Sequence, residues 1–217
     1  DAASYDTGSH TPTANTLNLM AVASSKATTP DIPTVSGNSL TWSQIATVLF
    51  SNNTRRLTMF GAIGASPAAG ATTADFGGNT QTGCEGNVVQ IAGTTGSTVA
   101  AIIAQSLSTS GDAVPALAVN LNRFASGENA IFAAFSLSKD VVVTAATGFT
   151  ELFDNGHATP DARLETQWRA GVADATFGSA DAAAIALELK GADSWCVTGA
   201  TRYSPVAHLI DETVQLY

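Results

Sequence analysis

Four carboxylates are the first residues whose types could support chemistry. Many glycosidases use a pair of Asp or Glu side chains, one as the acid and the other as the base or nucleophile. The candidates here are Glu151, Asp154, Glu165 and Glu188. Glu165 and Glu188 alternate with apolar neighbours in RLETQW and ALELK, so we expect both side chains to face solvent. Nothing singles out an acid–base pair, and we predict no glycosidase site.

Asp6 belongs to the tetrapeptide Asp-Thr-Gly-Ser, which aspartic proteases carry at their active site. That chemistry requires two aspartates that share one proton. The chain has no second Asp-Thr-Gly or Asp-Ser-Gly, and the nearest candidate, Asp154-Asn155-Gly156, lacks the hydroxyl residue. A single-lobed protease could obtain its second aspartate by dimerising. We expect instead that residues 4–12 form an opening strand and the turn after it.

Metal ligands and phosphate-binding loops are equally hard to find. No histidine has a second His or Cys at ligand spacing, and the three lie far apart, at His10, His157 and His208. Asp154, Asn155 and Asp161 could bind calcium from a loop, but they lack the EF-hand spacing. Gly-x-Ser-x-Gly is absent, and the Gly-rich pieces do not join a strand to a helix. We predict no enzyme, no catalytic residue, no cofactor and no metal.

Aromatic side chains and thiols offer two further possibilities. Trp42, Trp168 and Trp195 could stack on sugar rings, but Trp42 and Trp168 lie in strand patterns, where packing in the core or at an edge is the simpler interpretation. Cys84 and Cys196 are the only cysteines, and they form either one disulfide or two buried free thiols. We favour free thiols.

The composition limits the classes of partner. The chain has 217 residues, a net charge of −9 and only 12% charged residues, about half the usual share. An acidic chain lacks the broad basic surface that nucleic acids and anionic membranes require, and no apolar run is long enough to span a membrane. The low charge is typical of a protein that sits in an assembly or outside a cell.

The chain also resembles itself. Asn15 matches Asn129, Arg56-Leu57 matches Arg163-Leu164, and Gly93 matches Gly191, within five segments that recur in the same order. The paired segments are 12–24 with 126–137, 37–45 with 147–153, 55–64 with 162–171, 72–78 with 173–179, and 85–93 with 182–191. We predict an internal repeat, about residues 4–93 and 118–191. The alternative is that antiparallel strands look alike by chance.

These segments must position any functional residue, and they have the character of strands. Short apolar or alternating runs are bounded by Gly, Asn, Pro, Ser and Thr. Only residues 98–108 could instead be a helix, and we favour a strand. We predict an all-β fold, an antiparallel β-sandwich (jelly-roll-like) of ten to twelve strands over residues 1–191, in which the two similar halves share one core. Two separate sandwiches are the alternative.

Residues 192–217 lie outside both halves and form a predicted C-terminal arm. The arm is apolar enough that it must pack on something. It covers either an open sheet edge of its own domain or a neighbouring subunit. Its large apolar side chains are the predicted interaction residues: Trp195, Tyr203, Leu209, Ile210 and Tyr217.

A family resemblance connects these segments. The succession TLNLMAVASS, PTVSGNSLTW, RRLTMFGAIGASPAAGATTADFGG, NVVQIAGT, GENAIFAAFS, GFTEL, ARLETQWRAG and AAAIALELKG resembles β-sandwich domains of virion structural proteins in tailed bacteriophages. The resemblance covers about residues 4–191 and carries no catalytic residue. It implies a capsid-decorating, head-fibre or tail-associated role.

Two functions follow as expectations. The first is a non-enzymatic structural protein at the virion surface, whose partners are other capsid or tail proteins and further copies of itself. The second is a glycan-binding adhesin module that recognises a host. We expect neither nucleic acid nor membrane as a partner.

Overall fold

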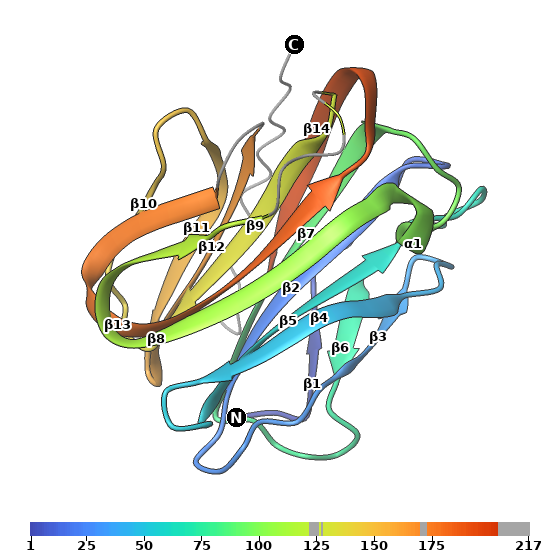
Figure 1. Ribbon diagram of the computed structural model, residues 1–217. Coiled ribbons are helices and arrows are strands. Elements are labelled where there is room, and N and C mark those ends of the chain that lie inside the picture. Colours follow the sequence, from blue (N-terminus) through green and yellow to red (C-terminus); the bar gives the residue numbers. More distant parts are fainter. Residues whose placement is uncertain (122–125, 127, 170–172, 204–217) are drawn as a thin grey trace.

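The computed structural model describes residues 1–121, 126, 128–169 and 173–203. Most of them form antiparallel strands, arranged as two large sheets packed face to face and one small sheet (Figure 1). This confirms the predicted all-β sandwich. The small helix α1 (Val99–Ile102) is the one helix described, and it is far too short to cross a bilayer.

The first large sheet has five strands in the order β14-β7-β2-β5-β4. These strands are β2 (Leu17–Ser25), β4 (Ser43–Phe50), β5 (Arg55–Ala62), β7 (Gly83–Thr94) and β14 (Gly191–Tyr203). The small sheet, in the order β1-β6-β3, contains β1 (Ser4–Asp6), β3 (Thr34–Gly37) and β6 (Thr72–Asp75). Its first strand confirms that residues 4–12 open with a strand.

The second large sheet has six strands. Five follow the order β10-β13-β9-β12-β11, and β8 pairs with β13. Their bounds are β8 (Ile103–Val119), β9 (Ala130–Leu137), β10 (Val143–Ala145), β11 (Thr150–Ala158), β12 (Asp161–Arg169) and β13 (Ala173–Leu189). Residues 98–108, for which the sequence allowed a helix or a strand, contain both. Thr98 caps the short helix α1, and β8 begins directly after it.

The two large sheets share one strand order. In the first, β2 lies between β7 and β5, and β4 follows β5; in the second, β9 lies between β13 and β12, and β11 follows β12. Even the irregularities correspond, because β4 has a bulge between Gln44 and Ala46 and β11 has one between Glu151 and Phe153. Bulges tend to be kept as specific features of a fold. An origin by duplication stays a prediction.

The register of the first repeat match was wrong by one residue. Leu17 faces the core between the large sheets, as does Ala130, whereas Ile131, its predicted counterpart, faces the opposite side of the second sheet. Side chains alternate between the two faces of a strand, so a shift of one residue reverses every orientation. An alignment by residue type cannot detect this error where both faces are apolar.

Three apolar clusters explain why both faces are apolar. The central cluster joins the large sheets, with Leu19 and Met59 from the first and Phe132 and Ile185 from the second. A second cluster lies between the first sheet and the small sheet, around Tyr5 and Phe76, whose rings meet edge to face at 5.9 Å. A third covers the outer face of the second sheet, where the second half of β8, β10 and the start of β13 fold over β9.

Candidate functional site

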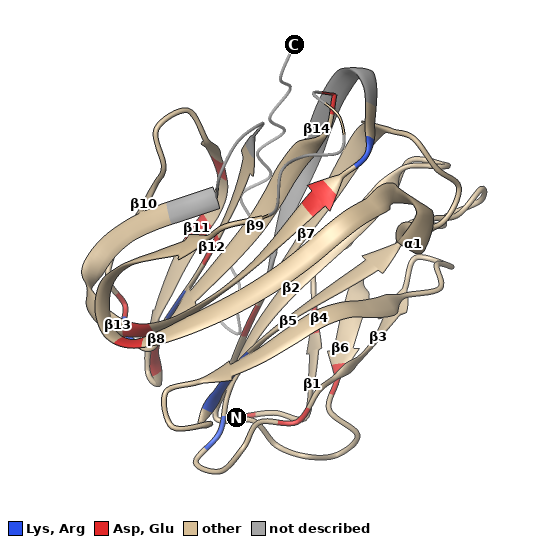
Figure 2. Cartoon of the chain, viewed as in Figure 1, with Lys and Arg blue, Asp and Glu red and all other residues tan. Residues whose placement is uncertain are grey.

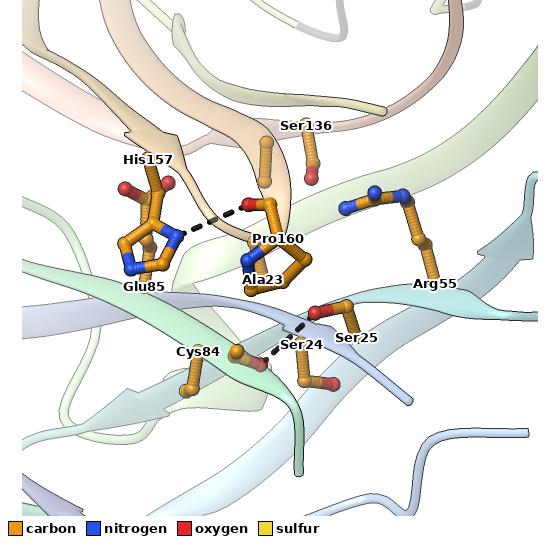
Figure 3. A pocket seen from close by; sticks show the side chains of 11 residues that line it. Ala23, Ser24, Ser25, Arg55, Cys84, Glu85, Ser136, His157 and Pro160 are labelled. Carbon is orange, nitrogen blue, oxygen red and sulfur yellow. Dashed lines mark hydrogen bonds between the residues drawn. The ribbon is translucent and has the colours of Figure 1, made fainter. Parts of the chain in front are cut away.

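One crevice opens between the two large sheets, at the end where β2 and β9 finish and β5 and β7 begin. It encloses about 280 Å³, including space open to solvent. Its polar walls come from both sheets (Figure 3): Ser24, Ser25, Arg55, Cys84 and Glu85 from the first, Ser136 and His157 from the second. No sequence pattern had pointed to Arg55 or Glu85, because they lie far apart in the chain.

Glu85 is a strongly perturbed group in the crevice. Its side chain is only 3% exposed. Asn155 Nδ2 donates to Oε1 at 3.0 Å, while Oε2 has no hydrogen-bond partner among the described residues. Burial raises the pKa of Glu85 to about 8, because a charge in a dry environment is costly. At neutral pH this side chain is therefore largely a neutral carboxylic acid.

Arg55 and His157 complete the crevice without forming a catalytic pair with Glu85. Burial lowers the pKa of Arg55, and the nearby Asp161 and Asp181 partly offset that shift. His157 Nδ1 lies 3.0 Å from the Pro160 carbonyl oxygen, a contact that requires the proton on Nδ1. Arg55 thus offsets the charges of Asp161 and Asp181, and His157 satisfies a backbone carbonyl.

The nucleophiles of the crevice are not activated. Burial, and secondarily the charge of Glu85, raise the pKa of the Cys84 thiol far above its usual value, so the reactive thiolate does not form. Ser25 Oγ donates to the Gly83 carbonyl at 3.4 Å instead of to a base. Among the described crevice residues, neither Cys84 Sγ nor Ser25 Oγ is shown bonded to a base, which is the arrangement that activates a nucleophile.

The residues considered as possible calcium ligands, Asp154, Asn155 and Asp161, are bonded to protein groups. Arg163 holds Asp154 through two hydrogen bonds of 2.5 and 2.7 Å, and it also bonds Asp140 at 2.8 Å. Asn155 donates to Glu85, and Asp161 accepts from the backbone N–H of Asp140. Among the described residues, no group of three His, Cys, Asp or Glu side chains could hold a metal ion.

The expectation that Glu165 and Glu188 face solvent is wrong. Both are buried, at 0% and 1% exposure. The alternation was correct, since both point away from the central core, but that outer face is covered by the third apolar cluster. Glu188 accepts from Gln105 and Asn129, each at 2.5 Å. Neither carboxylate oxygen of Glu165 has a hydrogen-bond partner among the described residues, and burial raises its pKa well above the usual value.

The remaining candidates are separated in space. Asp6 is exposed and accepts a hydrogen bond from Thr73 Oγ1 at 2.5 Å. His10 Nδ1 contacts the Gly8 carbonyl, and His208 lies outside the described residues. Trp168 is 8% exposed within the central core, and Trp42 packs beside the cluster under the small sheet. The expectation that these two tryptophans pack is confirmed.

The backbone register separates the two cysteines. Cys196 on β14 lies opposite Ala92 of β7, eight residues along that strand from Cys84. At about 3.3 Å per residue, the two positions are roughly 26 Å apart, far beyond the reach of a disulfide. Cys84 is a buried free thiol, as predicted.

The C-terminal arm begins as a strand of the sandwich. Residues 191–203 form β14, which pairs with the outer edge of β7. This part follows the alternative in which the arm covers an edge of its own domain. Of the predicted interaction residues, Trp195 and Tyr203 lie on β14, and their side chains are not described. Leu209, Ile210 and Tyr217 lie outside the described residues.

A second candidate site is a surface without charge. The edge strands β4 and β8 lie against each other on one side of the sandwich. Residues 43–50 and 103–111 contain no Asp, Glu, Lys or Arg, and Figure 2 shows both strands uncoloured along these stretches. We call this surface the uncharged side. Its exposed residues include Ser43, Gln44, Ser106 and Ser108, with Leu107 at 45% exposure.

Comparison with known proteins gives no assignment for either site. The chain matches no family model, no curated protein and no solved structure.

Proposed function

We propose that this chain is a non-enzymatic structural protein of a virion, a capsid decoration or another head or tail surface protein that acts through protein–protein contacts. The observation that carries the proposal is the uncharged side. The central parts of protein interfaces are depleted in charged residues. A chain with net charge −9 that keeps β4 and the adjacent first half of β8 free of charge has a surface suited to such contacts.

The crevice supports the same interpretation. Its polar groups bond across the two sheets or neutralise neighbouring charges, burial keeps its thiol protonated, and Ser25 Oγ donates to the Gly83 carbonyl. The resemblance to phage virion domains suggests the kind of assembly. In such a protein, binding stabilises the assembly by burying interface area rather than by chemistry.

Immunogold labelling tests this function directly. Antibodies against the purified chain would be applied to phage particles from the organism that carries the gene, and labels at the head or tail are expected. A glycan array with the same protein provides the contrasting measurement. Specific retention on sugars, together with unlabelled particles, would overturn the proposal in favour of the adhesin function.

A further inference from the structure

We infer that the first half of β8 pairs with the β8 strand of a second copy of this chain, so that the two six-stranded sheets continue into one another. The inference deepens the proposed function, because it names the surface and the partner of one contact. It rests on the backbone edge, the absence of charge and the symmetry that two copies impose.

The backbone edge is open. β8 pairs with β13 in continuous register from Gln105 to Gly111, and no strand among the described residues pairs with its other edge. The side chains of residues 106–108 and 110 are exposed. A strand in this state presents a row of free N–H and C=O groups, which is a template for another strand.

The protection that edge strands usually carry is missing in this stretch of β8. Charges, prolines and bulges normally prevent edges from pairing. Beyond Gly111 the same strand has Asp112, a positive φ of 51° at Ala113, Pro115 and register shifts. The edge strand β11 carries Glu151 and Asp154 and also has a bulge. Between residues 105 and 111, β8 has none of these features.

Charge favours a second copy as the partner. Two chains of net charge −9 repel each other, and the repulsion at the contact is smallest where neither carries charge. The uncharged side meets that condition. A basic partner would interact more favourably with the acidic parts of the surface. The uncharged edge is therefore better suited to a neutral strand, such as the same strand of a second copy.

Two-fold symmetry gives acceptable neighbours across the contact. In an antiparallel pair centred on Ser108, Ser106 would face Ser110 of the other copy, and Leu107 would face Thr109. Hydroxyl pairs, and aliphatic side chains beside a threonine methyl group, are favourable cross-strand neighbours. Such an isologous contact closes on itself and produces a dimer. β4, which lies against β8, would be brought to the same interface.

Sedimentation equilibrium of the full chain tests the inference, from low micromolar to millimolar concentration. We expect a reversible dimer, weakened about tenfold or more by Leu107→Lys and by Ser108→Lys, since each places two like charges near each other. Val142→Lys is the matched control, because Val142 is 68% exposed and lies before β10. It should dimerise as the wild type does. Hydrogen exchange of amides 106–110 should slow as concentration rises.

Each contrary outcome is informative. A wild-type chain that stays monomeric throughout, or a dimer that both β8 variants leave unchanged, overturns the pairing. Equal weakening by Val142→Lys shows that the effect is not specific to β8 and also overturns the pairing. Particle labelling separates this inference from the proposed function: a monomer that labels particles refutes only the pairing, and a β8 dimer that labels none refutes only the virion role.

Discussion

At the level of single residues, two buried carboxyls, Glu85 and Glu165, should contribute to the pH dependence of stability. Both have a pKa above the usual value, and burial is the main cause for both. The folded protein therefore binds their protons more tightly than the unfolded chain does. Each contributes stability in acid that is lost as the pH rises.

Replacing Glu85 with Gln should flatten the pH dependence of stability. The pKa of Glu85 rises from 4.5 to about 8 on folding. Its contribution is complete below the lower value and is lost as the pH passes through the higher one. Over this window the group should lower the free energy of unfolding by about 1.4 kcal/mol per pH unit. Urea denaturation across the window measures the slope, which Glu85→Gln should reduce.

The matched control is Asp112→Asn, which removes a carboxylate that is exposed on β8. It should leave the slope unchanged. If Glu85→Gln also keeps the wild-type slope, Glu85 is ionised in the folded protein and its buried environment has been misjudged.

Asn38 should be among the polar residues most costly to replace. It has a positive φ of 57°. Its Nδ2 donates to the carbonyls of His10, Ala68 and Gly70, and its Oδ1 accepts from Thr72 at 2.7 Å. Asn38→Ala should lower the free energy of unfolding by about 2–3 kcal/mol, measured by urea denaturation. Asn38→Asp keeps the acceptor and loses the donors, so an undiminished stability of Asn38→Asp would show that the three carbonyl contacts contribute little.

At the level of secondary-structure elements, the β11–β12 hairpin is packed tightly against β7. A Cβ atom added at Gly83 would lie 2.7 Å from Pro160 Cγ and 2.9 Å from Ser25 Oγ. Gly83→Ala should therefore destabilise the protein by about 1–3 kcal/mol, as measured by thermal or urea unfolding. Gly178→Ala on β13 is the control, because its nearest neighbour would be Val141 Cγ1 at an ordinary 3.5 Å. Equal stability of the two variants would mean that the β11–β12 hairpin shifts to accommodate the added methyl group without a cost in stability.

The strands were predictable because their signals are local. Apolar runs such as LNLMAVASS and AIFAAFSL, ended by turn residues, correspond to β2 and β9. The environment of Glu165 and Glu188 was not predictable, because whether the outer face of a sheet is covered depends on segments remote in sequence, here β8 and β10. The crevice escaped prediction for the same reason. Arg55, Glu85 and His157 come from three strands, and only the packing of the two sheets brings them together.

At the level of the whole molecule, the two halves of the sequence unite in one core. The central cluster takes residues from both large sheets, and Ser51 donates to Asp181 across the halves at 2.6 Å. Neither sheet can lose its partner without exposing its inner face to water. The halves should therefore unfold together.

Single-tryptophan variants test this cooperativity. Trp42 reports on the first half and Trp168 on the second. Each variant would keep only one of them, with the other tryptophans replaced by Phe. Unfolding by urea, followed by fluorescence, should be two-state in both variants, and the free energy of unfolding should fall with urea concentration at the same slope. Circular dichroism of each variant should superimpose on its fluorescence curve. If the unfolding curves from fluorescence and circular dichroism had different midpoints for the same variant, a shared core would be contradicted.

The position of β14 has a consequence for biosynthesis. The strand that lies outside β7 is the last one described, although β7 belongs to the first half of the chain. On the ribosome, residues 95–190 must be translated after β7 before this neighbouring strand begins. The nascent chain thus carries an incomplete sheet until β14 has been translated, and during that interval the open edge of β7 is a site that chaperones can bind.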